Sequence, residues 1–145
     1  GSGKSSLIRV AAGLLRPAAG SVARNGQAAL ADEHLALDRE LPLGRALAFW
    51  NAKPGDGLEA MGIGHLAQVP VRLLSTGQAR RARLARVIAA EAPLWLLDEP
   101  LKGLDRDGAD RLAEATAGHG RGGGAVLAAS HQALGSGWRQ LELGA

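Results

Sequence analysis

Residues 74–100 read LSTGQARRARLARVIAAEAPLWLLDEP, and this stretch decides the fold. Its first part carries apolar residues at helical spacing and predicts a helix from Leu74 and Ser75 through about Ala90. The arginines of this helix are expected to point largely outward, and they are Arg80, Arg81, Arg83 and Arg86. The run 94–97 is short and apolar and ends in two acids, which is typical of a buried parallel strand. A helix that leads into such a strand indicates an α/β fold.

Further elements continue this alternation on both sides. The expected helices cover residues 4–15, two short segments within 41–66 around a Pro/Gly turn, and residues 108–117. The expected strands cover residues 27–31, residues 125–129 and a last segment from near Trp138, and residues 118–124 are expected to form a glycine-rich connection. The pattern predicts a mostly parallel sheet flanked by helices, with a small helical insert.

Composition limits the class of protein. The 145 residues suit one compact domain, and 46% hydrophobic with 21% charged residues exclude a disordered or fibrous chain. The absence of cysteine excludes disulfides and thiolate metal sites and fits a reducing compartment. The net charge of +3 is spread along the chain and does not compel a nucleic-acid partner. No stretch approaches the roughly 18 apolar residues of a membrane span, so a membrane role is expected to run through a partner.

The opening GSGKSS matches the second half of the phosphate-loop pattern G-x-x-x-x-G-K-[ST], whose first glycine falls upstream of residue 1. Glycine lets backbone N–H groups surround phosphate oxygens, and the following helix directs its positive end at them. Lys4 is expected to reach the β and γ phosphates of a nucleotide, and Ser5 to bind Mg²⁺. The alternative is a flexible leader. The candidate phosphate-binding residues are Gly1, Ser2, Gly3, Lys4, Ser5 and Ser6.

Three other positions carry candidate chemistry. Ser75 can cap the helix that follows, while Gly77 lets the backbone approach a phosphate, although a plain helix cap has the same sequence. Asp98 and Glu99 end an apolar strand, so that one carboxylate can face a metal and the other an attacking water. The alternative is two acids that merely end a strand. His131 follows the strand 125–129, at the end where open α/β sheets bind ligands, although a lone histidine is more often structural.

These motifs, in this order, resemble the ABC ATPase family over nearly the whole chain. The resemblance implies a head-to-tail dimer in which two chains enclose two ATP molecules. It implies that the signature residues of one chain bind the nucleotide of the other, and these residues are Ser75, Thr76, Gly77 and Gln78. It also implies a D-loop with Asp105 at the dimer interface, although Lys102 departs from the small residue that is common there.

The same resemblance assigns the catalytic roles. It implies that Ser5 binds Mg²⁺ directly and Asp98 through its hydration shell, that Glu99 orients or deprotonates water, and that His131 senses the γ-phosphate. Glu33 stands where the family has a glutamine that touches Mg²⁺ and the membrane partner, so it is a further candidate metal ligand. The family's adenine-stacking aromatic falls upstream of residue 1. We therefore expect the isolated 145-residue chain to fold marginally and to bind ATP poorly.

Within the family, the segments LSTGQARRARLARV, APLWLLDEP, ASHQ and LPLGRALAFW are most similar to the ATP-binding subunits of haem exporters in cytochrome c maturation. That similarity implies a peripheral protein on the cytoplasmic face of the bacterial inner membrane. It implies an integral membrane permease as partner and, indirectly, haem and a periplasmic haem chaperone, with no nucleic acid. The alternatives are the ATPase of another ABC exporter or importer, a soluble ABC protein acting on nucleic acid or ribosomes, and an inactive nucleotide-binding module.

The expected domain is a single ABC nucleotide-binding domain over residues 1–145 that lacks its N-terminal strands. Residues 1–32 and 90–145 are expected to form the catalytic core. Residues from about 35 to 88 are expected to form a helical subdomain that contains the signature helix.

Overall fold

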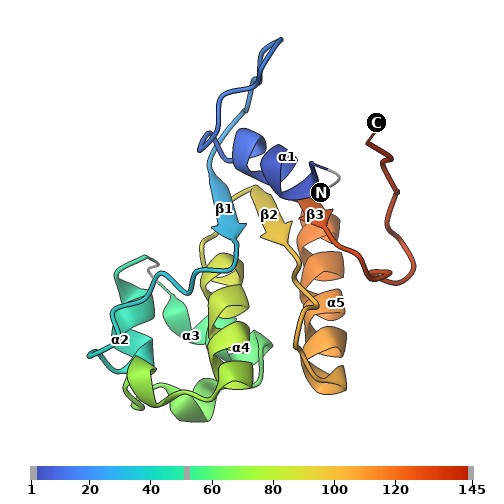
Figure 1. The fold of residues 1–145 in the computed structure, drawn as a ribbon. Helices are drawn as coiled ribbons and strands as arrows, with labels where there is room; N and C mark the ends of the chain where they lie inside the picture. Colours follow the sequence, from blue (N-terminus) through green and yellow to red (C-terminus); the bar gives the residue numbers. More distant parts are fainter. Residues whose placement is uncertain (1–2, 51–52, 144–145) are drawn as a thin grey trace.

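The computed structural model describes residues 3–50 and 53–143. Within them, three parallel strands form one sheet in the order β1, β2, β3 (Figure 1). The strands are β1 (Ala28–Ala31), β2 (Leu94–Asp98) and β3 (Ala125–Ala129). Each connection between neighbouring strands contains helices, as parallel pairing requires. The strands predicted around residues 27–31, 94–97 and 125–129 are confirmed.

The helices fill these connections and the start of the described chain. They are α1 (Lys4–Ala11), α2 (Leu43–Ala48), α3 (Pro54–Ala60), α4 (Thr76–Ile88) and α5 (Arg106–Arg121), with short 3₁₀ turns η1 (Gly64–Leu66) and η2 (Val71–Leu73). Among the described residues, no helix has the length and apolar character needed to cross a bilayer.

Alternating side chains of the strands build two hydrophobic clusters, one on each face of the sheet. Leu96 of the central strand packs with Ile8 of α1 on one face. Trp95 and Leu97 point to the other face, into a larger cluster that includes residues of α2 to α5. Both leucines are almost completely buried. The fold therefore has layers, with α1 on one side of the sheet and the remaining helices on the other (Figure 1).

The larger cluster runs without a break from the sheet into the helical insert. Trp95 on β2, Leu84 on α4 and Leu47 on α2 all belong to it. Figure 1 shows α2, α3 and α4 gathered at the lower end of the molecule. The division into a catalytic core and a helical subdomain stays a prediction.

The first helix is shorter than predicted, because it ends at Ala11 and not at residue 15. Gly13 adopts a left-handed conformation with φ +77°. Its N–H donates to the Val10 carbonyl at 3.0 Å, and the N–H of Leu14 donates to the Arg9 carbonyl at 2.9 Å. These two bonds form a Schellman motif, which ends a helix at glycine.

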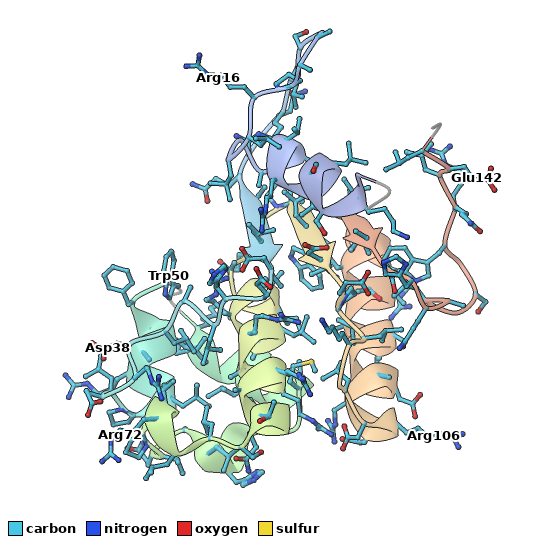
Figure 2. The ribbon with its side chains drawn as sticks, in the orientation of Figure 1. Arg16, Asp38, Trp50, Arg72, Arg106 and Glu142 are labelled. Atoms are coloured by element: carbon cyan, nitrogen blue, oxygen red, sulfur yellow. The ribbon has the colours of Figure 1, made fainter. Side chains whose placement is uncertain are left out.

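The arginines of α4 do not all point outward, so that prediction is wrong. Arg83 is buried and donates to the carbonyl of Asp32, while half-buried Arg86 donates to the Leu30 carbonyl at 2.6 Å. Arg86 also lies 5.1 Å above the ring of Trp50, which Figure 2 labels. Burial lowers the pKa of both guanidinium groups. The end of β1 offers carbonyl groups that these long side chains satisfy.

The last helix is longer than predicted, because α5 continues through the first part of the glycine-rich segment to Arg121. His119 stabilises that extension by stacking on Trp95, with ring centroids 3.9 Å apart, and its Nε2 lies 3.2 Å from the Pro93 carbonyl. The strand predicted from Trp138 is absent from the described residues, since 138–143 carry no strand assignment. A strand needs a neighbour with which to exchange backbone hydrogen bonds.

Candidate functional site

The start of α1 forms the described part of the phosphate loop. Gly3 precedes the helix with φ +75°, and its carbonyl accepts the N–H of Leu7 at 2.9 Å. A Cβ at Gly3 would meet no atom within 4 Å, so its backbone angle and not a lack of space favours glycine. Lys4 begins the helix, and Ser6 is exposed on its first turn. Gly1 and Ser2 lie outside the described residues.

Ser5 and Asp98 come together where α1 crosses the carboxyl end of β2. The Ser5 hydroxyl donates to Oδ1 of Asp98 at 2.9 Å. A hydroxyl and a carboxylate are ligands that suit Mg²⁺, which commonly binds one or two protein groups together with phosphate oxygens. In the part of the chain that the structure describes, no group of three or more His, Cys, Asp or Glu side chains fits a metal. The Ser5 and Asp98 pair therefore fits Mg²⁺ only in company with a nucleotide.

Lys4, His131 and Glu99 meet at the carboxyl ends of β2 and β3. Nζ of Lys4 lies 3.1 Å from Nδ1 of His131. An ammonium group has no lone pair to accept with, so Nδ1 accepts and a neutral imidazole carries its proton on Nε2. That Nε2 lies 3.5 Å from Oε1 of Glu99. The three side chains form a chain of contacts next to Ser5, the sequence neighbour of Lys4, and can act on one bound phosphate.

Glu33 follows β1 and is paired elsewhere. Its carboxylate forms an exposed ion pair with Arg9 at 3.9 Å. Among the described residues, no hydrogen bond or ion pair joins Glu33 to Ser5 or Asp98. Its place as a metal ligand stays a prediction.

The predicted signature residues form the first turn of α4. The hydroxyl of Ser75 accepts the N–H of Gln78 at 3.2 Å, and Oε1 of Gln78 accepts the N–H of Ser75 at 2.8 Å. This reciprocal pair is a capping box, which satisfies two backbone donors at the start of the helix. Thr76 and Gly77 are exposed, and a Cβ at Gly77 would meet no atom within 4 Å. The free face of this turn can approach another molecule closely.

The signature turn and the phosphate loop lie far apart in the chain's own fold. Figure 1 shows α1 above the sheet and the first turn of α4 at the lower end of the molecule. A cavity of about 380 Å³ opens beside the signature turn, and its lining includes Ser75, Gly77, Leu104 and Asp105. The two segments lie at opposite ends of the chain's fold, which is the arrangement that a head-to-tail pair requires (Figure 1).

Arg81 is a residue of this region that sequence reasoning missed. Its side chain is only 13% exposed and forms ion pairs with Asp105 at 2.6 Å and Asp107 at 2.7 Å. The arginine-rich face suggested a solvated surface. The informative signal was the pair of acids at the start of α5, of which Asp105 belongs to the D-loop and Asp107 to the first turn of the helix.

The fold and the site together define a nucleotide-binding ATPase of the ABC type. The sequence model of the family described as "ABC transporter" matches residues 1–102. The cytochrome c biogenesis ATP-binding export protein CcmA of Sphingopyxis alaskensis is 58% identical over 141 residues, covering 92% of this chain and 73% of the relative. The protein of the same name from Novosphingobium aromaticivorans is 58% identical over 136 residues, with coverage of 92% and 71%. The chain belongs to this family of cytochrome c biogenesis ATP-binding export proteins, within the ABC transporters.

Solved structures agree on the fold. A structure described as the ATP-binding subunit of an ABC transporter has a TM-score of 0.77 at 22% identity, covering 90% of this chain and 64% of that chain. RNase-L inhibitor gives a TM-score of 0.77 at 23% identity over 89% of this chain, which spans only 27% of that protein. At such identities the likeness concerns the fold alone, so it lends no weight to an action on RNA.

Proposed function

We propose that the chain binds and hydrolyses Mg²⁺-ATP as one of two ATP-binding subunits of a membrane export complex, and that the exported compound is haem. The observation that carries the hydrolytic part is the meeting of Lys4, Glu99 and His131 beside the Ser5 and Asp98 pair. The assignment of haem as the cargo is supported by the relatives, whose names specify cytochrome c biogenesis and export.

Each side chain has a role in this proposal. Lys4 binds the β and γ phosphates, and Ser5 and Asp98 hold Mg²⁺, which offsets the charge on the phosphate oxygens when bound. Glu99 accepts a proton from the attacking water, and His131 orients that water and the γ-phosphate. Ser75 and Gly77 bind the γ-phosphate held by the second subunit.

The partners follow from the same family. A second ATP-binding subunit completes each nucleotide site with its signature residues, including Thr76 and Gln78. An integral membrane permease carries the haem, and a periplasmic haem chaperone receives it. The protein sits at the cytoplasmic face of the inner membrane, bound to the permease.

Lys4→Ala in the full-length protein tests both parts of the proposal. We expect ATP affinity to fall at least about tenfold, because the charge-assisted contact with phosphate is lost. Cells that carry this variant are expected to lose haem-containing c-type cytochromes. Lys53→Ala is the matched control, since Lys53 pairs with exposed Glu91 away from the phosphate loop. Unchanged ATP affinity would refute the phosphate site, while lost affinity with normal c-type cytochromes would point to another cargo.

A further inference from the structure

The guanidinium of Arg81 connects three segments of the chain. Its NH2 group donates to Oδ1 of Asp105 at 2.6 Å. Its NH1 group donates to Oδ2 of Asp107 at 2.7 Å and to the carbonyl of Met61 at 2.9 Å. One side chain on the signature helix therefore binds the D-loop, the first turn of α5 and the end of α3.

The acids on the other side of this contact have structural partners of their own. Oδ1 of Asp105 also accepts the N–H of Gly108 at 3.1 Å and so caps α5. Oδ2 of Asp107 also accepts Nε of Arg111 at 2.9 Å. Because the oxygen that caps α5 is the one that Arg81 binds, a shift of α4 must disturb the start of α5.

The charges of this cluster support one another. Burial alone would lower the pKa of Arg81, but its hydrogen bonds to Asp107 and Asp105 raise it. The hydrogen bonds from Arg81 lower the pKa of both acids. All three groups are thus charged at neutral pH. A planar guanidinium with several donors is the side chain best suited to hold two carboxylates at fixed angles.

Arg81 lines the cavity beside the signature turn, so its ion pairs with Asp105 and Asp107 help to set the shape of that cavity. Ser75 and Gly77 line one wall of the cavity, and Leu104 and Asp105 line another. Arg81 lies on the same helix as Ser75, less than two turns away. Arg81 ties the first wall to the second through charged partners, alongside a single hydrogen bond from NH1 of Arg80 to the Gly103 carbonyl at 3.1 Å.

We propose that Arg81 is a positioning residue that makes the signature turn and the D-loop one rigid unit, so that nucleotide contact at either one fixes the other. This inference rests on the proposed function, because it assumes that both segments face a second ATP-binding subunit. Arg81 itself need not touch the nucleotide.

The test is a mutant cycle on the dissociation constant of the ATP-bound dimer. Full-length protein carrying Glu99→Gln is used to slow hydrolysis, and dimerisation is followed by sedimentation with ATP and Mg²⁺. Ser75→Ala and Leu104→Ala are measured singly and together, because each perturbs one wall of the cavity without removing a partner of Arg81. With Arg81 present, we expect the dissociation constant of the double variant to differ by about tenfold from the value that independent effects would give, as in a shared interaction network.

Arg81→Met is then added to each member of the cycle. We expect the dissociation constant of the double variant then to lie within about twofold of the value for independent effects, which is the behaviour of unconnected sites. Asp107→Asn provides a second, milder way to weaken the contact if Arg81→Met folds poorly. Arg106→Met is the matched control, because among the described residues the ion pair of Arg106 lies within α5, with Asp110 at 4.0 Å. Figure 2 shows Arg106 at the lower end of α5, pointing into solvent.

The outcomes separate the inference from the function on which it rests. A merely structural role for Arg81 would weaken the dimer but leave Ser75 and Leu104 coupled, and that result would overturn the inference. Loss of coupling in Arg106→Met as well would also overturn it. If Glu99→Gln protein fails to dimerise with ATP at all, the proposed function fails, and the inference fails with it.

Discussion

Glu99 combines a proposed chemical role with an unfavourable backbone conformation. Its φ of +48° lies in the left-handed region, which disfavours residues with a Cβ by roughly 1–2 kcal/mol. Its N–H donates to the Ala129 carbonyl at 2.7 Å, and the following Pro100 is fully buried. These contacts hold the turn in place, and the turn brings the carboxylate to His131. Strain of this kind is often found at functional sites.

Glu99→Gln in the full-length protein is expected to lower kcat for ATP hydrolysis by about 10²–10⁴-fold, because an amide cannot accept the proton of the attacking water. ATP-dependent dimerisation is expected to persist, since Ser5 and Asp98 are unchanged. Steady-state ATPase assays and sedimentation measure the two quantities. Glu91→Gln is a matched control, because Glu91 is exposed and has the same φ of +48°. An unchanged ATPase rate in Glu99→Gln would exclude Glu99 as the base.

At the scale of helices, the signature helix is placed by its close packing against α3. Gly57 of α3 is buried against α4, and a Cβ built on it would lie 2.1 Å from the Ala85 carbonyl oxygen and 3.0 Å from Cβ of Ala89. The close approach of these helices therefore depends on the missing side chain. Backbone atoms cannot move aside as a flexible side chain can.

Gly57→Ala is expected to lower the free energy of unfolding of the full-length protein by about 1–3 kcal/mol, because the two helices must separate to admit the methyl group. Gly55→Ala on the same helix is the control. A Cβ there would meet no atom within 4 Å, so helix propensity predicts no loss and a gain of up to about 1 kcal/mol. Urea unfolding of both variants measures the difference. Equal stabilities would show that α3 and α4 repack freely.

Helices and strands could be predicted from the sequence wherever the spacing of apolar residues agreed with the residues that begin or end an element. The run 94–97 was followed by acids and the signature helix began at a serine cap, and both are where they were expected. Errors arose where contacts distant in sequence decide the structure. Gly118 lies inside α5 because the neighbouring His119 stacks on Trp95, a contact that helical spacing alone does not reveal.

For the molecule as a whole, sequence motifs predicted candidate phosphate, metal and signature residues but only some of the contacts between them. The pairing of Ser5 with Asp98 follows from the ABC resemblance. The burial of Arg83 and the ion pairs of Arg81 do not, because a helical repeat cannot tell which charged face another element will cover. Only the packing of α4 between β1 and α5 settles those positions.

The cluster around Arg81 should also give the stability of the whole protein a specific dependence on pH. Arg81 lowers the pKa of Asp105 and Asp107 in the folded state, whereas the unfolded chain has the ordinary value of about 3.9. A lowered folded pKa means that the stabilisation is complete above the unfolded value and is lost as pH falls through the folded value. The advantage of wild-type protein over Arg81→Met should therefore be constant from pH 7 to about pH 4 and shrink below it.

Urea unfolding of the full-length protein between pH 7 and pH 3 provides the measurement. A part of the difference in free energy of unfolding between wild-type protein and Arg81→Met should remain at low pH. The variant also removes the hydrogen bond that Arg81 donates to the Met61 carbonyl. Arg106→Met should show little of this profile, since Arg106 is 96% exposed and its partner Asp110 is 4.0 Å away. A difference that vanished between pH 7 and pH 5 would be inconsistent with carboxylate titration and would implicate a histidine instead. The change in the stability difference below about pH 4 therefore shows whether Arg81 acts through Asp105 and Asp107 or through packing alone.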